Sequence, residues 1–228
     1  MLRSPRARAG SARMLPAARS PRRLALYLAI AALALPGGAC ALARRRASEP
    51  LVDLRDIVPE VVVDIRYAQP RNFTHQVLYP ANRCLLRATV ARQLSLVQSD
   101  LALQGLRLKV WDCYRPLSIQ RKLWELVPDP RYVADPKQGS RHNRGAAVDA
   151  TLVDPAGREL EMPTDFDDFS PKAHRDAVTA TPVALRNREL LETVMTGHGF
   201  AGLKTEWWHF DAKGWKEYPI LDDPITPR

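Results

Sequence analysis

Two short segments of the sequence combine histidine with carboxylates. The first is SRHNRGAAVD at residues 140–149, and the second is TEWWH at residues 205–209. Between them they contain His142, Asp149 and His209, and imidazole and carboxylate groups together are ligands that suit zinc. Three protein ligands with an open fourth position are typical of a catalytic zinc site. We therefore predict that each chain holds one zinc ion.

The spacing within each segment requires a particular backbone. Seven residues separate His142 from Asp149, so the two meet only if the chain folds back between them, and Gly145 permits such a turn. Glu206 and His209 are three residues apart and point to opposite faces of a regular strand. A shared pocket therefore requires a β-bulge or the end of the strand, and bulges are common beside active sites.

Each of these residues also has a purely structural explanation. Taken alone, Asp149 is a charge at the edge of a strand, and His209 is a core histidine packed against the neighbouring tryptophans. Taken together, the two segments set four polar side chains beside apolar strands, where burial without a partner costs several kcal/mol for each group. A bound metal ion removes that cost, so the combination favours a metal site.

The elements that must position these side chains begin near residue 51. Apolar residues at helical spacing, with Pro116 at one helix start, predict helices over residues 88–103, 116–127 and 182–197. β-Branched or alternating apolar residues predict strands over residues 61–68, 106–112, 146–154 and 202–210. The polar, proline-containing connection 128–144 is long for an irregular loop, and such loops are often functional. The order of elements predicts an α+β fold, one compact domain with a central, mainly antiparallel sheet flanked by helices.

A third segment, WDCYRP at residues 111–116, adds a family resemblance. With SRHNRGAAVD and TEWWH it resembles the signatures of the D-alanyl-D-alanine dipeptidases of the VanX type, within the wider D,D-peptidase and hedgehog superfamily. The resemblance covers roughly residues 51–220 and includes RYAQPRNFT at 66–74 and FDDFSPKAH at 166–174, which look like substrate-pocket segments of that family. It implies a zinc enzyme that hydrolyses D-Ala-D-Ala to two D-alanines.

The resemblance also implies catalytic roles. The three predicted ligands become the zinc ligands of the family, and Glu206 becomes the base that takes a proton from the attacking water. Arg115, in the turn after strand 106–112, is implied to neutralise the developing oxyanion, with Asp112 beside it as an orienting partner. The alternative for Arg115 is a surface arginine.

The substrate of such an enzyme is a small dipeptide with a free amine and a free carboxylate. By resemblance, Tyr67, Asp167, Ser140 and Tyr79 are expected to contact it, with Asp167 pairing with the ammonium group and Ser140 and Tyr79 donating to the carboxylate. Two other functions stay open. One is a zinc D,D-carboxypeptidase that trims longer muropeptides, and the other is a non-catalytic zinc domain that binds cell wall or a protein partner.

The positive charge of the chain is concentrated near its start. Of the 34 Lys and Arg residues, ten arginines precede the first acidic residue, Glu49, which leaves 24 basic against 25 acidic residues in the remainder. A nearly neutral body lacks the clustered basic face that binding to phosphate backbones requires. We therefore predict no nucleic-acid partner.

The beginning of the chain has the features of an export signal. Residues 24–35, LALYLAIAALAL, are uncharged, follow an arginine-rich stretch and precede PGGACALA. The run is shorter than the roughly 20 residues that span a bilayer, and it has the three regions of a secretory signal. We predict an export signal over residues 1–43, a lead-in over 44–50 and the zinc dipeptidase domain over 51–228, located in the periplasm or at the outer cell surface.

Two details of the leader bear on the export route. The pair Arg22-Arg23 fits twin-arginine export, and Cys40, after Gly38-Ala39, fits a lipoprotein signal with acylation of the cysteine. Contact with a membrane is then expected only through the leader or a lipid on Cys40. An uncleaved membrane anchor is the alternative.

The remaining cysteines form an even pair. With Cys40 in the leader, Cys84 and Cys113 are left in a chain bound for an oxidising compartment, where disulfides persist. We predict that they form a disulfide bond, and the alternative is two separate buried thiols.

Overall fold

The computed structural model describes residues 48–228, so the predicted export signal and Cys40 lie outside the described residues. The strands in this part of the chain are β1 (Leu51–Asp53), β2 (Val62–Val63), β3 (Leu85–Arg87), β4 (Arg107–Asp112), β5 (Ala147–Val153), β6 (Phe200–Leu203) and β7 (Glu206–Ala212). The α-helices are α2 (Leu54–Ile57), α3 (Ala88–Ala102), α4 (Leu117–Leu126) and α5 (Pro182–Gly197). Short 3-10 helices lie at Arg66–Ala68, His142–Arg144, Pro171–Ala173 and Trp215–Glu217.

A five-stranded sheet in the order β2-β4-β5-β7-β6 forms the centre of the fold. The β4–β5, β5–β7 and β7–β6 pairs are antiparallel, and only β2 pairs with β4 in parallel. Strands β1 and β3 form a separate antiparallel pair. The predicted α+β fold with a central, mainly antiparallel sheet is confirmed.

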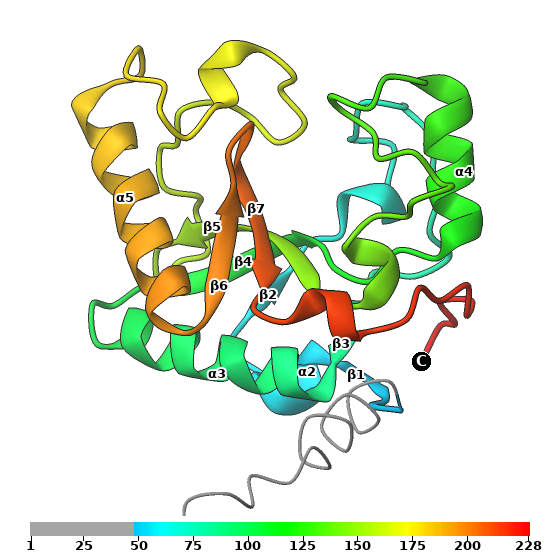
Figure 1. Cartoon of the computed structure of the whole chain (residues 1–228). Helices are drawn as coiled ribbons and strands as arrows, with labels where there is room; N and C mark the ends of the chain where they lie inside the picture. The colour runs from blue at the N-terminus through cyan, green and yellow to red at the C-terminus, as the bar shows by residue number, and fades with distance from the viewer. Residues whose placement is uncertain (1–47) are drawn as a thin grey trace, which may run out of the picture. The chain divides into compact units, whose positions relative to one another are not determined.

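The helices flank this sheet on different sides. Helix α3 contacts β4 and α5, and α5 contacts β6, while Figure 1 shows α4 across the molecule from α5. The apolar positions that predicted α3, Val90, Leu94, Val97 and Leu101, are all buried. Helix α5 begins at Pro182 and is capped by the Thr181 hydroxyl, which accepts a hydrogen bond from the Ala184 amide.

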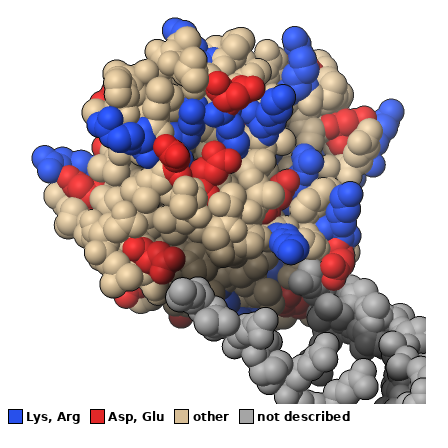
Figure 2. Space-filling view, turned by 60° about the vertical axis from the view of Figure 1, so that its left-hand side comes forward, with Lys and Arg blue, Asp and Glu red and all other residues tan. Residues whose placement is uncertain are grey.

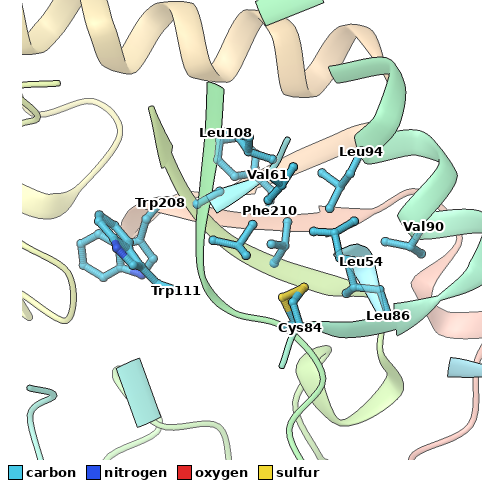
Figure 3. Close-up of a cluster of buried hydrophobic side chains, with 14 of the residues drawn as sticks. Leu54, Val61, Cys84, Leu86, Val90, Leu94, Leu108, Trp111, Trp208 and Phe210 are labelled. Atoms are coloured by element: carbon cyan, nitrogen blue, oxygen red, sulfur yellow. A yellow bond between two sulfur atoms is a disulfide. The ribbon is translucent and has the colours of Figure 1, made fainter. Parts of the chain in front are cut away.

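Apolar packing between α3, the central sheet, α2 and β3 forms the main core. Figure 3 shows Val90 and Leu94 of α3 beside Leu54 and Leu86, with Phe210 of β7 next to them. Side chains of this size contribute about 1.5 to 3 kcal/mol each when fully buried. The core therefore fixes β7, the strand that carries two of the predicted site residues.

A disulfide bond between Cys84 and Cys113 joins the segment before β3 to the turn after β4. Both cysteines are buried, and Figure 3 shows the bond at the edge of the apolar cluster. The pairing is the one expected from the cysteine count. It ties down the turn that continues to Arg115.

Two predicted strands differ from the observed elements. The predicted strand 61–68 is extended only at Val62–Val63 and then forms the 3-10 helix Arg66–Ala68, because the side chain of Asn82 bonds the Ile65 amide and the Val63 carbonyl and ends the strand. The predicted strand 202–210 is a hairpin of β6 and β7 with a turn at residues 204–205.

Pro116 precedes α4 as its N-cap residue, so that helix begins one residue later than predicted.

The described surface carries charges of both signs. In Figure 2, acidic and basic side chains are interspersed over the face shown, without a separate basic region. None of the helices within residues 48–228 is both long enough and apolar enough to cross a bilayer.

Candidate active site

His142 is held in the short helix His142–Arg144, and the chain folds back immediately after it. Gly145 ends this helix with a φ of 63°, in the left-handed region. A Cβ atom at Gly145 would also lie 2.5 Å from Leu51 Cδ2, so a larger residue would strain the backbone and would have to displace the Leu51 side chain. The chain then enters β5, whose third residue is Asp149. The structure thus has the fold-back that the spacing of His142 and Asp149 required.

Asp149 and His209 are neighbours across the sheet. They pair directly in the antiparallel register of β5 and β7, and both are buried. Residues opposite each other on antiparallel strands have Cβ atoms about 4.5 to 5.5 Å apart, close enough for their side chains to share a ligand.

Glu206 reaches the same pocket because the pairing of β6 with β7 is irregular. Gly202 pairs with Phe210, whereas the next residue of β6, Leu203, pairs with Glu206. The three β7 residues between those partners have no counterpart on β6. Glu206 is also the first residue of β7. The structure therefore has both of the features that could bring Glu206 and His209 into one pocket, an irregular pairing and the end of a strand.

The three predicted ligand atoms converge. His142 Nε2 lies 3.1 Å from His209 Nδ1 and 3.4 Å from Asp149 Oδ1, and His209 Nδ1 lies 3.0 Å from Asp149 Oδ1. Around a tetrahedral zinc ion with bonds of about 2.0 to 2.2 Å, ligand atoms lie roughly 3.3 to 3.6 Å apart. Among residues 48–228, His142, Asp149 and His209 are the histidine and carboxylate side chains whose ligand atoms lie close enough together to hold a metal ion.

The outward nitrogens of both histidines are already bonded. His142 Nδ1 lies 2.7 Å from the Cys113 carbonyl oxygen, and His209 Nε2 lies 2.9 Å from Asp211 Oδ1. Because carbonyl and carboxylate oxygens only accept, each of these nitrogens carries a proton, and the inward nitrogen of a neutral ring has a lone pair. Such outer partners are usual for histidines that bind metals. The inward side of the site is therefore a set of three acceptors that fits a cation.

The charges around the site also favour a cation. Burial opposes the charged form of His209, but hydrogen bonds with Asp149 and Asp211 raise its pKa to about 10. Burial also opposes the charge of Asp149, yet the two histidines lower its pKa below the usual value. A proton on His209 balances the carboxylates when no metal is bound, and a metal ion can replace that proton.

Glu206 has the environment of a general base. Its Oε2 lies 3.9 Å from His209 Nδ1, and its side chain is 17% exposed. Burial raises the pKa of Glu206 above its ordinary value, with Asp149 adding to the effect and His209 opposing it. A carboxylate with a raised pKa binds a proton more readily near neutral pH.

Arg115 is buried, which excludes the surface arginine considered above. Its Nη2 and Nε donate to Asp112 Oδ2 over 2.6 and 3.2 Å, and its Nη1 donates to Gln120 Oε1 over 2.9 Å. The pairing of β4 with β5 shifts between Val110 and Asp112, which sets Asp112 opposite Asp149. The guanidinium thus lines the pocket in a fixed orientation, with Asp112 as the orienting partner that the sequence predicted.

Two of the four predicted substrate contacts lie together in the pocket. The Tyr67 hydroxyl lies 3.3 Å from Asp167 Oδ2, and both residues line the cavity. Asp167 has a φ of 59°, a left-handed conformation that non-glycine residues rarely adopt and that is common at functional sites. Burial raises the pKa of Asp167 well above its usual value, and Asp149 and Glu206 raise it further. A positively charged ligand would reverse that effect.

The other two predicted contacts differ from one another. Ser140 lines the pocket, and its hydroxyl accepts a hydrogen bond from the His142 amide over 3.3 Å. Tyr79 is fully buried beside the pocket and donates to Asp112 Oδ1 over 2.8 Å. Its hydroxyl thus helps to orient Asp112, and Tyr79 is not among the residues that line the pocket, so its expected contact with the substrate carboxylate stays a prediction.

The pocket has a volume of about 510 Å³, within the usual range for small-molecule sites. Its outer walls come from three loops that meet through aromatic rings, since Phe169 stacks on Tyr132 at 4.8 Å and contacts Phe73 edge-on at 5.2 Å. The long connection 128–144 supplies one of these walls, as its length suggested. The metal-ligand group lies at the sheet end of the cavity.

Some residues of the site were not predicted. Asp211, Gln120 and the Cys113 carbonyl each orient a predicted residue, and none has a sequence signature of its own. Asp211 follows His209 by two residues, which places both side chains on one face of β7. The two-residue repeat of a β-strand was the signal in the sequence that could have identified Asp211 as a partner of His209.

Comparisons with known proteins point to one family. Residues 47–226 match the peptidase family described as D-ala-D-ala dipeptidase. The chain is 42% identical over 176 residues to the D-alanyl-D-alanine dipeptidase of Escherichia coli, a match that covers 77% of this chain and 91% of that protein. It is 29% identical over 185 residues to the D-alanyl-D-alanine dipeptidase of Enterococcus faecalis, covering 71% and 86%.

Similarity to solved structures is weaker. The structure of the vancomycin resistance D,D-dipeptidase VanXYg in complex with a D-Ala-D-Ala phosphinate analog aligns with 72% of this chain and 66% of that chain, at 18% identity and a TM-score of 0.39. A similarity at that level does not bear on the function.

Proposed function

Since the chain belongs to the family of D-Ala-D-Ala dipeptidases and is a metallo-dipeptidase, we propose that it hydrolyses free D-Ala-D-Ala to two D-alanines with one zinc ion. In this proposal His142, Asp149 and His209 hold the zinc ion, Glu206 is the base and Arg115 stabilises the oxyanion.

The observation that carries the proposal is the convergence of two ring nitrogens and one carboxylate oxygen, which a metal ion can bind once it has replaced the proton on His209. The inward atoms of His142, Asp149 and His209 lie 3.0 to 3.4 Å apart, and the outward ring nitrogens are used by Cys113 and Asp211. Two nitrogens and one oxygen, with room on the pocket side, fit a catalytic zinc site. When bound, zinc would polarise the scissile carbonyl and make water a stronger acid.

Glu206 performs the proton transfers in the proposed reaction. Its carboxylate, on the pocket side of His209, takes a proton from the attacking water. It then passes this proton to the nitrogen of the breaking peptide bond, which leaves as the amine of the second D-alanine. The raised pKa of Glu206 suits a group that must both accept and release a proton.

Arg115 supplies fixed positive charge where the carbonyl oxygen becomes an anion. Asp112 and Gln120 fix three of its nitrogens, so the guanidinium does not reorganise during the reaction. Burial opposes the charge of Arg115, but Asp112, Tyr67 and Tyr79 keep its pKa well above the usual value. The cation therefore persists at any pH at which the enzyme folds.

Asp167 is the group that would recognise the free amine of the dipeptide. Its charged form is disfavoured by burial and by Asp149 and Glu206, so an ammonium group beside it removes an unfavourable interaction. The Tyr67 hydroxyl donates a hydrogen bond to the Asp167 carboxylate over 3.3 Å. A substrate with an acylated amine would leave Asp167 without a cationic partner.

The closing test compares substrates and metal contents. We expect turnover of free D-Ala-D-Ala that a chelator abolishes and added zinc restores, and much slower cleavage of an N-acylated tripeptide ending in D-Ala-D-Ala. Preference for the acylated tripeptide would replace the dipeptidase by a D,D-carboxypeptidase. A His209→Ala protein that kept full zinc occupancy would remove His209 from the ligand set, and zinc binding without hydrolysis of either peptide would support a non-catalytic domain.

The location and biological role form a second part of the proposal. The arginine-rich, apolar and small-residue regions of residues 1–43 support export, and an exported dipeptidase would serve peptidoglycan turnover or recovery of D-alanine. Mass spectrometry of the protein from the cell envelope should find a start near residues 40–47, with added lipid mass if Cys40 is acylated. A protein that kept residue 1 and remained in the cytoplasm would overturn this part.

A further inference from the structure

The irregular pairing of β6 with β7 leaves backbone groups without strand partners at the point where the site is built. Leu203 pairs with Glu206, and the neighbouring β6 residue, Gly202, already pairs with Phe210. His209 therefore has no pairing partner on β6. A buried carbonyl group in such a position needs another hydrogen-bond donor, because leaving it unpaired is unfavourable.

The side chain of Arg175 provides that donor. Its Nη2 donates to the His209 carbonyl over 2.6 Å, and its Nε donates to the Leu203 carbonyl over 2.9 Å. The Arg175 amide donates to the Lys204 carbonyl over 3.0 Å, so main chain and side chain both hold the hairpin turn. The Cζ atom of Arg175 lies 4.3 Å from the centroid of the Phe210 ring, and the Arg175 side chain is 9% exposed.

The surroundings of Arg175 are shaped to admit the guanidinium. Glu192 of α5 lies 3.4 Å from Nη1 and balances its charge. A Cβ atom at Gly202 would lie 2.1 Å from Arg175 Cζ and 2.2 Å from Nε, so any side chain at Gly202 would displace the group. Gly202 has an ordinary φ, which leaves close approach of the guanidinium as the reason for glycine there.

We infer that Arg175 is a positioning residue that stabilises the irregular β6–β7 pairing and so holds Glu206 and His209 on the same side of β7. The inference rests on the proposed roles of those two residues as base and zinc ligand. Among the described residues, no hydrogen bond or ion pair joins Arg175 to either side chain, although its charge interacts with Glu206 at longer range. Arg175 acts through the carbonyl of His209 and through the strand residue that pairs with Glu206.

Two bonds from one planar group explain why the residue is arginine. The guanidinium presents several N–H groups in a fixed fork, whereas the lysine ammonium is a single point charge on a flexible chain. Lysine at this position could serve one carbonyl at a time. We therefore expect Arg175→Lys to recover only part of what Arg175→Met loses.

The first measurement follows zinc affinity and turnover in Arg175→Met. Displacement of catalytic groups by about 1 Å lowers kcat roughly a hundredfold, so we expect a fall of that order at saturating zinc, with KM changed by less than about threefold. Competition with a chelator should show zinc affinity about tenfold lower, as for loss of other groups that orient ligands. Arg186→Met, at an exposed position of α5, is the matched control and should change neither value.

A double-mutant cycle separates positioning from a general structural role. If Arg175 acts through Glu206, Arg175→Met should lower kcat by less than about threefold in a Glu206→Gln background, because coupled residues are not additive. Full additivity would overturn the inference, as would wild-type kcat and zinc affinity in Arg175→Met. The single variant Glu206→Gln tests the proposed function separately, because Arg175 is unchanged in it. Wild-type turnover in Glu206→Gln would contradict the proposed role of Glu206 as the base.

A second variant guards against misfolding of Arg175→Met. Gly202→Ala keeps Arg175 but forces its guanidinium away from the hairpin. We expect Gly202→Ala to lower kcat and zinc affinity in the same direction as Arg175→Met, and the two changes together to cost little more than either alone. A Gly202→Ala protein with unchanged zinc affinity and kcat would contradict the inference.

Discussion

At the scale of single residues, the site depends on which atoms of each side chain are already bonded. The outward nitrogens of His142 and His209 are engaged, and so are the three nitrogens of Arg115. Glu206 differs, because among the described residues no hydrogen bond to its carboxylate is seen, and its Oε2 lies 3.9 Å from His209 Nδ1. This freedom suits a group that must exchange protons.

Replacing Glu206 by glutamine tests the proton transfer apart from zinc binding. The amide keeps the size of the side chain but cannot accept a proton, so kcat should fall by about two to four orders of magnitude, the usual contribution of a positioned base. Zinc content, measured by elemental analysis, should stay at one ion per chain because the ligand set is untouched. Glu189→Gln, exposed on α5, is the control. Turnover equal to wild type in Glu206→Gln would remove Glu206 from the mechanism.

Replacing Arg115 by lysine tests the fixed orientation of its charge. Lysine retains the charge but cannot bond Asp112 and Gln120 together in one plane, so stabilisation of the oxyanion weakens. We expect kcat to fall by about two to three orders of magnitude, as for loss of an oxyanion donor. Steady-state kinetics should show a much smaller change in KM. Arg121→Lys, on the exposed side of α4, should behave as wild type, and equal activity of Arg115→Lys would exclude this role.

At the scale of elements, the site is assembled where the sheet is irregular. The pairing shifts between Val110 and Asp112 in β4 and between Gly202 and Leu203 in β6. The first shift sets Asp112 under Arg115, and the second brings Glu206 to the side of His209. Regular pairing throughout would turn one residue of each pair to the opposite face of the sheet.

Sequence patterns predicted most of the regular elements and the three residues that the structure brings together, but not these irregularities. Helices α3 and α5 were predicted because their apolar residues recur at helical spacing over many residues. The hairpin turn at Lys204-Thr205 was missed because neither residue is typical of a tight turn. The end of β2 was missed because it is set by Asn82, a residue far along the chain. Contacts of that kind depend on the tertiary fold and leave no local signal.

The disulfide between Cys84 and Cys113 fixes one of these irregular turns. The two cysteines are 29 residues apart, and closing a loop of that length in the unfolded chain stabilises a protein by about 3 to 4 kcal/mol. We expect the double variant Cys84→Ser with Cys113→Ser to lose that much free energy of unfolding in urea at saturating zinc. Reductants are avoided because many bind zinc. A loss below about 1 kcal/mol would show that packing alone holds the turn.

At the scale of the whole molecule, the positive charge is concentrated before residue 49. The ten arginines before Glu49 account for the net positive charge of the chain, and residues from 49 onward carry 24 basic and 25 acidic groups. Interspersed charges on the face in Figure 2 agree with that balance. A neutral small dipeptide gains little from long-range steering by such a surface. In the proposed function, recognition of the dipeptide therefore depends on the buried charges of the pocket.

Those buried charges also link zinc, protons and the stability of the whole domain. In the zinc-free protein, hydrogen bonds with Asp149 and Asp211 outweigh burial and raise the pKa of His209 to about 10, above its ordinary value of 6.5. A raised pKa means that the protonated group stabilises the fold. This stabilisation is fully present below pH 6.5 and is lost as the pH rises through about 10.

We therefore expect the free energy of unfolding of the zinc-free protein, from urea titrations, to fall by a few kcal/mol between pH 6.5 and 10. His209→Gln, which cannot take up this proton, controls for other groups that titrate in the same range and should show a shallower decline. With zinc bound, His209 is deprotonated throughout, so the decline assigned to it should disappear. Zinc binding near pH 7.5 should accordingly release about one proton, measured from binding enthalpies in buffers of different ionisation enthalpy. Parallel pH curves for the zinc-free wild type and His209→Gln, together with zinc binding that releases no proton, would mean that His209 does not bind the metal through Nδ1.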